Sequence, residues 1–524
     1  MIMAVKKILG ELIIAGPGAG KTFNMVESII EALQDLSPCR YLAVITYTNS
    51  ATNNIYNRLS KRIIIPENLF IGTMHSFLNR FIVIPFSSYG VENVGKEKLF
   101  MQCGINDVFQ KVEKMKDKEK RSKTNQDAAI IKSNIKKKLN KLGYITFDQT
   151  LSISKECMSK TPISRIISNR IQYLFVDEFQ DSGNEVFSII DNIRKANKTK
   201  IYCVGDPEQY IQSFDSSIRD FKNIPILKAS GSNSYNVKIN NKNYRSANTI
   251  VEFLNQFNGR VFKNQKFEQI AVSKVSGTKE VNSGEKVLFI SQWETVKPII
   301  EAFTSKCESI SISKANRCIL AKRNDVINRV KAALNNQYMD PKKNSGVLPI
   351  KAIQDTLLST LQLNQTQFCD KYETNIFTLR KYAVAIFKAI NSGIITNENT
   401  FGLFVKDVLK LEMKEGLPVK IENLKFDFNN KEVGNYVTVA NIHTIKGLES
   451  EAVLAISKTE EELLLWIETD HAIRESKRDN EKTDYPRLGY VAFSRAERLL
   501  CIACLEKISD TTISKLSNLG VVIP

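Results

Sequence analysis

Residues with the types and spacing of a nucleotide site lie near both ends of the chain. Residues 15–22 read AGPGAGKT, and residues 490–496 read YVAFSRA. The first segment carries Gly16, Gly18, Gly20, Lys21 and Thr22. Glycines at this spacing let backbone N–H groups converge on phosphate oxygens, while the Lys reaches the β and γ phosphates and the Thr binds Mg²⁺. The second segment offers Arg495, so we expect two lobes with ATP between them.

A pair of carboxylates, Asp177 and Glu178, directly follows the apolar residues 173–176. In such a pair the Asp can hold Mg²⁺ and the Glu can polarise the attacking water. One departure from the strict phosphate-loop pattern is Ala15, which stands where that pattern has Gly. A glycine-rich turn that binds nothing is the alternative, but it does not explain a Lys and a Thr at these positions.

The elements that must position these residues alternate between strands and helices. Short apolar strands are predicted at residues 12–15, 41–46, 69–73, 173–177 and 201–206, and an amphipathic helix at 22–36. This alternation is typical of a parallel sheet in an α/β domain. Two of the strands end in a carboxylate, and the ends of parallel strands are where such sheets place ligands.

Charge and composition limit the class of protein. The chain of 524 residues has 74 Lys and Arg against 56 Asp and Glu, a formal net charge of +18. This excess favours a polyanionic partner, with a basic protein unrelated to nucleic acid as the alternative. Residues 111–141 hold twelve of the cations and four of the anions. We expect nonspecific phosphate contacts from this stretch, although for single lysines a solvated helix face explains as much.

The nine cysteines predict no metal site. Only Cys501 and Cys504 form a C-x-x-C, and no second pair completes a zinc or iron–sulfur site. We therefore interpret the cysteines as reduced and structural, which favours a cytoplasmic protein. No segment approaches the ~18 uninterrupted apolar residues of a membrane span, and no cleavable leader is recognisable.

Eight motifs, in order, resemble those of superfamily 1 DNA helicases of the UvrD, Rep and PcrA type. The phosphate loop is similar to motif I, and residues 176–181 (VDEFQD) are similar to motif II. The others are residues 46–49 (TYTN, motif Ia), 72–77 (GTMHSF, Ib), 204–209 (VGDPEQ, III), 243–246 (NYRS, IV), 442–449 (IHTIKGLE, V) and 490–496 (VI). The resemblance spans residues 12 to about 505.

The resemblance implies roles at the nucleotide. Gln209 would sense the γ-phosphate, Tyr244 would stack on the base, and Glu449 would hold the ribose. Arg245 and Arg495 would reach the γ-phosphate from the second lobe and stabilise the charge of the transition state. An arginine that engages only when the lobes close would couple the chemistry to motion.

The resemblance also implies a track for a DNA strand. Tyr47 and Phe214 fall at positions where the family stacks bases, and Thr73, His75 and Thr444 fall where it contacts the backbone. For Phe214, core packing is the alternative interpretation. For His443, inside motif V, a structural hydrogen bond is as good an explanation as a functional one.

The implied fold is α/β, with two RecA-like parallel-sheet domains that each carry a mostly helical insertion. The predicted boundaries are residues 1–86 and 166–242 for the first domain and 87–165 for its insertion. The second domain would comprise 243–335 and 433–524, with a short insertion at 336–432.

Several positions depart from the family. The family has a glutamine before motif I that reads adenine, whereas the first glutamine here is Gln34, so base specificity stays open. Asp215 stands where the family often has an arginine, and Ser50 where it often has a lysine. The insertion at 336–432 is short, and we expect no fused nuclease after motif VI. These departures weaken the prediction of a stand-alone unwinding enzyme.

The leading hypothesis is an ATP- and Mg²⁺-dependent translocase on single-stranded DNA, with 3′→5′ direction implied by the resemblance. The domain organisation also resembles the helicase-like subunit of Gabija anti-phage systems, which implies a partner nuclease. Another small bacterial UvrD-like protein is the alternative, so the expected role is anti-phage defence or DNA repair. The second hypothesis is therefore a DNA-gated ATPase subunit that signals to a nuclease without processive unwinding. A third hypothesis is an NTPase that acts on protein or small molecules. Tyr47, His75 and Phe214, at positions where the family contacts DNA, argue against it.

Overall fold

The computed structural model covers the chain, and it describes most of its residues. The described residues are 10–90, 101–102, 133–134, 136–137, 140, 144–212, 218–273, 284–292, 294–335, 337–340, 349–363, 365–374, 376–412, 436–445 and 447–523. Of the stretch 111–141, five residues fall within these ranges, and the rest of that basic segment lies outside them, as does Phe214.

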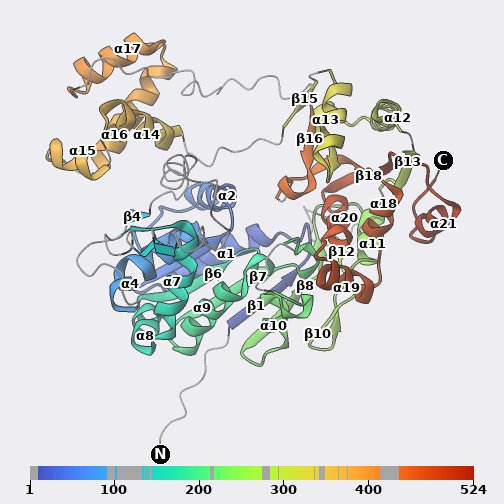
Figure 1. Ribbon diagram of the computed structural model, residues 1–524, viewed down its shortest axis with the longest axis horizontal. Helices are drawn as coiled ribbons and strands as arrows, with labels where there is room; N and C mark the ends of the chain where they lie inside the picture. The colour runs from blue at the N-terminus through green and yellow to red at the C-terminus, as the bar shows by residue number, and fades with distance from the viewer. Residues whose placement is uncertain are drawn as a thin grey trace, which may run out of the picture. The chain divides into compact units, whose positions relative to one another are not determined.

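The first lobe is built on a six-stranded parallel sheet with the order β3-β2-β6-β7-β1-β8. Its strands are β1 (Gly10–Ala15), β2 (Tyr41–Thr46), β3 (Leu69–Thr73), β6 (Ile171–Val176), β7 (Lys200–Gly205) and β8 (Tyr235–Asn240). In Figure 1 they run from blue to green. The adjacent central strands β6, β7 and β1 end in the segments that carry the predicted nucleotide residues.

Helices cover both faces of this sheet, because apolar side chains along its strands point alternately to one face and to the other. On β2, Leu42 and Val44 pack with one cluster, and Ala43 and Ile45 pack with the other. The helices are α1 (Lys21–Gln34), α2 (Asn49–Ser60), α3 (Met74–Leu78), α4 (Ile84–Gly90), α7 (Phe147–Ser159), α8 (Thr161–Arg170), α9 (Asn184–Lys195) and α10 (Pro225–Gly231). The apolar stripe of α1, which includes Met25 and Ile29, is fully buried and fixes the helix behind the phosphate loop.

The second lobe is built on another six-stranded parallel sheet, with the order β13-β18-β17-β14-β16-β15. Its strands are β13 (Leu288–Gln292), β14 (Arg317–Ala321), β15 (Tyr338–Met339), β16 (Val437–Asn441), β17 (Ser450–Ser457) and β18 (Ala496–Cys504). The lobe takes its strands from two stretches of chain, before residue 341 and after residue 436. Motifs V and VI thereby join the lobe that begins at motif IV.

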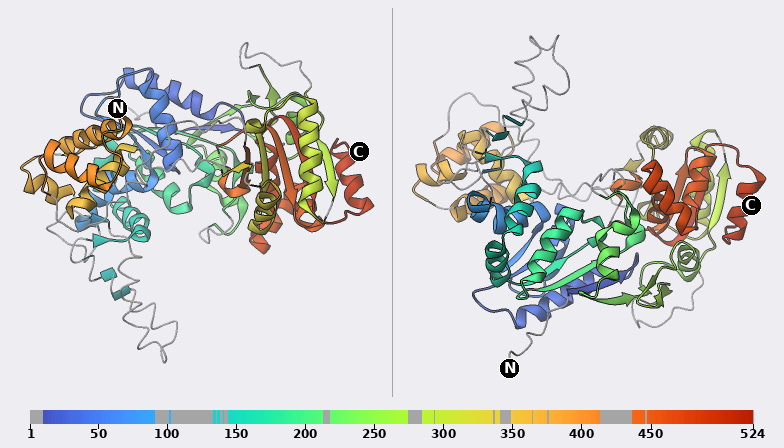
Figure 2. Two further views of the ribbon diagram at one scale, coloured as in Figure 1. Left: turned by 90° about the horizontal axis from the view of Figure 1, so that it is seen from above. Right: turned by 60° about the horizontal axis from the view of Figure 1, so that its bottom comes forward.

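Helices also cover both faces of the second sheet. One face holds α11 (Asn248–Asn255), α18 (Glu460–Trp466), α20 (Tyr485–Phe493) and α21 (Asp510–Asn518). The other face holds α12 (Val296–Ser309) and α13 (Asn324–Ala333). Yellow helices lie beside orange strands of this lobe in Figure 2, and α13 contacts β14 and β16. Helix α19 (His471–Glu481) precedes α20 and contacts the first lobe.

The helical segment within Lys342–Tyr436 forms a separate compact unit. It contains α14 (Pro349–Leu361), α15 (Gln365–Lys371), α16 (Ile376–Asn391), α17 (Glu398–Leu403) and the π-helical turn η7 (Phe404–Val408). Leu357, Phe368, Leu379 and Ile386 are among the fully buried residues of its own core.

The predicted fold class is confirmed: the chain is an α/β protein with two RecA-like parallel sheets. Two strands, β2 and β3, begin and end at the predicted residues. Among the described residues, no helix combines the length and hydropathy needed to cross a bilayer. Cys501 and Cys504 are buried in β18, where burial raises the pKa of both thiols.

Candidate active site

The phosphate loop joins β1 to α1 and is shaped by two glycines in the left-handed region. Gly18 has φ 69° and Gly20, the residue that caps α1, has φ 71°. A side chain would be strained at these backbone angles. Since α1 begins at Lys21, its first N–H groups are directed at the loop, and the positive end of the helix dipole favours an anion there.

Second-lobe residues pack against the outside of this loop. The amide nitrogen of Gln269 donates to the carbonyl of Pro17 at 2.9 Å, and a Cβ on Gly16 would lie 2.6 Å from the Gln269 side chain. Likewise, the Asn243 side chain occupies the place of a Cβ on Gly18. The glycines are therefore required by packing as well as by phosphate access.

Gln269 was missed by the sequence analysis, and no local signal could have found it. It lies far along the chain from the loop, in a segment that matches none of the eight motifs. Its backbone is held on both sides by Asn255, which donates to the Gln269 carbonyl and accepts from its N–H, each at 2.8 Å. Asn255 is the last residue of α11. The second lobe therefore holds Gln269 in place, and Gln269 in turn contacts the phosphate loop.

Asp177 is 5% exposed at the end of β6. Burial, together with the neighbouring Glu178 carboxylate, raises the pKa of Asp177 to about 7, while Lys21 acts in the opposite direction. A buried carboxylate under this electrostatic load is well suited to a divalent cation, which removes the cost of its charge. Thr22 at the start of α1 supplies a hydroxyl oxygen of the kind Mg²⁺ prefers, so the residues present fit the metal.

Glu178 is held in an unusual backbone conformation with φ 46°. Its carboxylate accepts a hydrogen bond from Gln180 at 2.7 Å and lies 3.6 Å from the Lys21 ammonium group. Strain at a non-glycine residue in this region persists only where the surroundings impose it, and such residues cluster at functional sites. Gln180 also accepts from the N–H of Asp206 at 3.1 Å, which joins motif II to motif III.

The segment after β7 brings the two lobes into contact. Gln209 donates to Asp206 at 2.9 Å and accepts from the Arg495 guanidinium at 3.1 Å. The Tyr490 hydroxyl donates to Asp206 at 3.3 Å. Burial, together with the charge of Arg245, lowers the pKa of Arg495 to about 9. The predicted sensor and the predicted arginine finger therefore meet across the lobes.

The other residues predicted to bind the nucleotide are Tyr244, Arg245 and Glu449. The N–H of Tyr244 donates to the Gly18 carbonyl at 2.8 Å, and its ring is 3.8 Å from where a Cβ on Gly20 would be. Arg245 donates to Glu449 at 2.6 Å and to the Ser494 carbonyl at 3.0 Å. The predicted ribose residue and one predicted phosphate arginine thus pair with each other.

The predicted strand-track residues have different surroundings, and their DNA contacts stay predictions. Tyr47 is half-buried against the first core, and its hydroxyl pairs with Ser182. Thr73 caps α3, and His75 is exposed in the first turn of that helix. Thr444 is exposed and donates to the Asn441 carbonyl at 2.8 Å.

The fold and the site define a class, a P-loop ATP hydrolase with two RecA-like domains. The family model for an AAA domain matches residues 3–215. This region includes the phosphate loop and the strand-end carboxylates of the first lobe.

Comparison with known proteins narrows the class. The chain is 22% identical to Gabija protein GajB from Bacillus cereus (strain VD045) over 515 residues, which is 95% of this chain and 94% of the relative. It is 25% identical to the ATP-dependent DNA helicase Rep from Buchnera aphidicola (subsp. Acyrthosiphon pisum), covering 50% of that protein, and 26% identical to PcrA from Staphylococcus aureus (strain Mu50), covering 38%. These similarities confirm the predicted resemblance to UvrD-like helicases, including Gabija-type ones.

Proposed function

We propose that the chain is an ATP- and Mg²⁺-dependent motor that moves along single-stranded DNA in the 3′→5′ direction. Lys21 binds the phosphates, Thr22 and Asp177 hold the metal, and Glu178 polarises the attacking water. Mg²⁺ supplies charge neutralisation at the transferred phosphoryl group. Gln209, Arg245 and Arg495 stabilise the transition state, Tyr244 stacks on the base, and Glu449 holds the ribose.

The observation that carries this proposal is the contact between Gln209 and Arg495. One residue follows a strand of the first sheet and the other follows α20 of the second lobe, at 3.1 Å. A γ-phosphate bound at this junction would be gripped by both lobes, and its loss on hydrolysis would release them. The chemistry would thereby be converted into relative movement of the lobes.

The net charge of +18 supports DNA as the track, because cationic surfaces release counterions when they bind a polyanion. Tyr47, Thr73, His75, Phe214 and Thr444 are the proposed contacts to the strand. Location in the cytoplasm follows from this function.

The direction of movement can be tested with streptavidin displacement. Oligonucleotides that carry biotin at either the 5′ or the 3′ end are incubated with the protein, ATP and Mg²⁺. We expect streptavidin to leave the 5′ end far faster than the 3′ end, and Lys21→Ala to abolish displacement at both ends. Displacement at the 3′ end alone would contradict the direction, and displacement at neither end would favour the second candidate.

The second candidate is a DNA-gated ATPase subunit of an anti-phage complex that contains a nuclease. The alignment covers 94% of the length of GajB but only 50% of the length of Rep. This coverage favours the domain organisation of GajB over that of a large helicase. Co-expression with a candidate partner nuclease, followed by affinity purification, tests whether the two proteins form a complex. A stable complex whose nuclease responds to ATP hydrolysis by this chain supports the candidate, and efficient unwinding by the isolated chain argues against it.

A further inference from the structure

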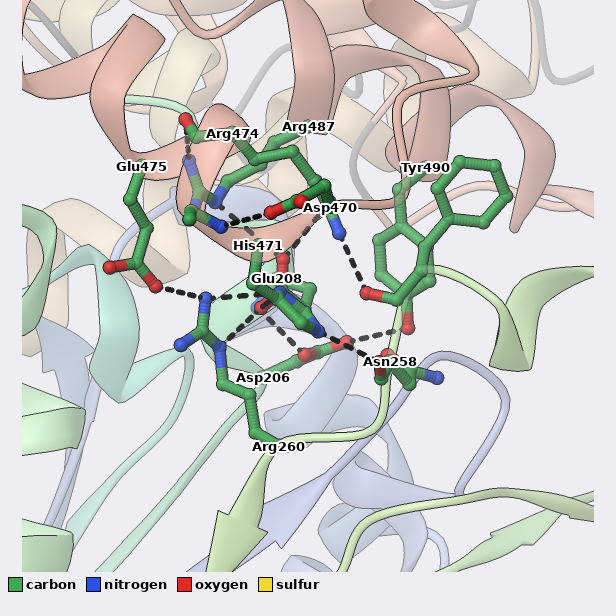
Figure 3. A network of polar contacts seen from close by, with 12 residues as sticks. Asp206, Glu208, Asn258, Arg260, Asp470, His471, Arg474, Glu475, Arg487 and Tyr490 are labelled. Carbon is green, nitrogen blue, oxygen red and sulfur yellow. Dashed lines mark hydrogen bonds and ion pairs between the residues drawn. The ribbon is translucent and has the colours of Figure 1, made fainter. Parts of the chain in front are cut away.

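Glu208 lies next to Gln209 but belongs to a separate network of charged groups. It is 2% exposed, in the 3₁₀ turn η4 (Pro207–Gln209) that follows β7. Its carboxylate lies 2.5 Å from the Arg260 guanidinium, 3.0 Å from that of Arg474 and 3.7 Å from that of Arg487. Figure 3 shows the three arginines around it. No role at the nucleotide was predicted for any of these four residues.

The charge of Glu208 is maintained by these neighbours. Burial alone would raise the pKa of its carboxyl, but Arg474, Arg260 and Arg487 together hold the pKa well below its usual value. Arg260 also pairs with Glu475 at 2.8 Å. The His471 imidazole, 3.6 Å from Glu208, has a pKa lowered by burial. One carboxylate oxygen of Glu208 accepts a hydrogen bond from Arg260, while the other lies in ion-pair range of Arg474 and Arg487.

All three arginines follow motif IV in the chain, so Glu208 ties the first sheet to the second lobe. The lobe contact continues around Phe221, which belongs to the first core. The guanidinium carbon of Arg487 lies 3.5 Å from the centroid of the Phe221 ring, and that of Arg260 lies 4.9 Å away. The N–H of Phe221 donates to Asp479 of α19 at 2.8 Å. Arg487 therefore stacks on a ring of the first lobe and lies in ion-pair range of Glu208, without a hydrogen bond to it.

Three contacts join two short segments of the chain. One segment is residues 206–209, and the other is α20 with the two residues that follow it. Glu208 meets Arg487, Asp206 meets Tyr490 at 3.3 Å, and Gln209 meets Arg495 at 3.1 Å. Every residue of α20 from Pro486 to Phe493 is buried, so a displacement at its first turn is carried to its end.

We propose that Glu208 is a positioning residue for ATP hydrolysis: through Arg487 and α20 it aligns Arg495 with Gln209. The inference rests on the proposed role of Arg495 at the γ-phosphate. A phosphoryl-transfer site depends on placement, and a misplacement of about 1 Å can cost roughly 100-fold in rate. Glu208 itself touches neither nucleotide nor water in this scheme.

The test is a double-mutant cycle in DNA-stimulated ATP hydrolysis, with Glu208→Gln, Arg495→Ala and the double variant. We expect Glu208→Gln to lower kcat by about tenfold or more while KM for ATP stays within about twofold. The double variant should be no more than about twofold slower than Arg495→Ala alone, because Glu208 acts through Arg495. Multiplied effects, or an unchanged kcat in Glu208→Gln, would overturn the inference.

Two further variants keep the test decisive. Glu462→Gln is the matched control, since Glu462 is also a buried carboxylate, 4% exposed. It accepts from the Lys458 N–H at 3.0 Å and its ion-pair partner is Arg323 rather than an arginine of this network. The control variant should retain the kcat of the unmodified protein. If Glu208→Gln does not fold, Arg260→Gln takes its place, because that arginine lies at the rim with 16% of its side chain exposed. It should give a smaller loss with the same non-additivity.

The outcomes also separate this inference from the proposed function. If Arg495→Ala retains full kcat, the assignment of Arg495 is wrong and the inference falls with it. If Arg495→Ala is inactive while Glu208→Gln and Arg260→Gln are both fully active, the proposed site stands and only the positioning role is refuted.

Discussion

The buried carboxylate of Asp177 should make the stability of the protein fall as pH rises. Its pKa is raised from the usual 3.8 to about 7 in the folded chain, mainly by burial. Between these two values the folded state binds a proton that the unfolded state has released, so each step up in pH favours unfolding. Asp177→Asn removes the titrating group but keeps an oxygen that can accept from the Glu178 N–H, as Asp177 does at 3.0 Å.

The magnitude follows from the two pKa values. One pKa unit corresponds to about 1.4 kcal/mol, so the full interval is worth roughly 4 kcal/mol of unfolding free energy. Over the experimentally convenient range from about pH 5 to pH 8, the stability difference between Asp177→Asn and the unmodified chain should grow by about 3 kcal/mol. The variant should gain relative stability as pH rises and show no advantage near pH 4.

Urea unfolding of both proteins without metal or nucleotide, at unit steps of pH, measures this difference. Asp325→Asn is the control, because its exposed carboxyl has a pKa lowered by Lys458 and is ionised throughout this range. The difference for that control should be independent of pH. A flat difference for Asp177→Asn would refute the reasoning, since the carboxylate would then be charged in the folded state without penalty.

Three further results are expected. Gln269→Ala should raise KM for ATP about fivefold with little change in kcat, because it loses one buried hydrogen bond to the phosphate loop, worth about 1 kcal/mol. The control Gln256→Ala, which loses a bond to the Leu519 carbonyl, should leave KM unchanged, and equal effects in both variants would refute the role of Gln269. Tyr244→Ala should weaken nucleotide binding about fivefold and Tyr244→Phe should not, because the ring is the binding surface; equal losses would contradict stacking. Affinity for single-stranded DNA should fall at least about tenfold from 50 to 200 mM salt, and the double variant Lys136→Glu with Lys137→Glu should show a weaker dependence of affinity on salt. An unchanged salt dependence would exclude the basic stretch at residues 111–141 from DNA binding.

The parts of the fold and site that could be predicted are those encoded locally. The limits of β2 and β3 are visible as apolar runs between polar residues, and the phosphate loop is visible because glycine spacing, Lys21 and Thr22 lie together. Asp177 and Glu178 could be placed at the end of a strand for the same reason. Ordered motifs then placed Gln209 and Arg495 in one site, and they contact each other.

The parts that could not be predicted depend on contacts between distant residues. Gln269 holds the phosphate loop from a segment without any motif, and the sequence shows no reason for it to do so. The partners of Glu208 are spread from Arg260 to Arg487, and only the packing of α19 and α20 brings them together. The hydroxyl pairing of Tyr47 is likewise a tertiary event.

If ATP hydrolysis between the two lobes drives a motor on DNA, steady-state hydrolysis must depend on single-stranded DNA, so the rate is measured with and without it. The assay uses Mg²⁺, low salt, and three proteins: the unmodified chain, Lys21→Ala and Arg495→Ala. We expect strong stimulation by DNA in the unmodified chain and its loss in both variants. Undiminished DNA-stimulated hydrolysis by either variant would contradict the site described here.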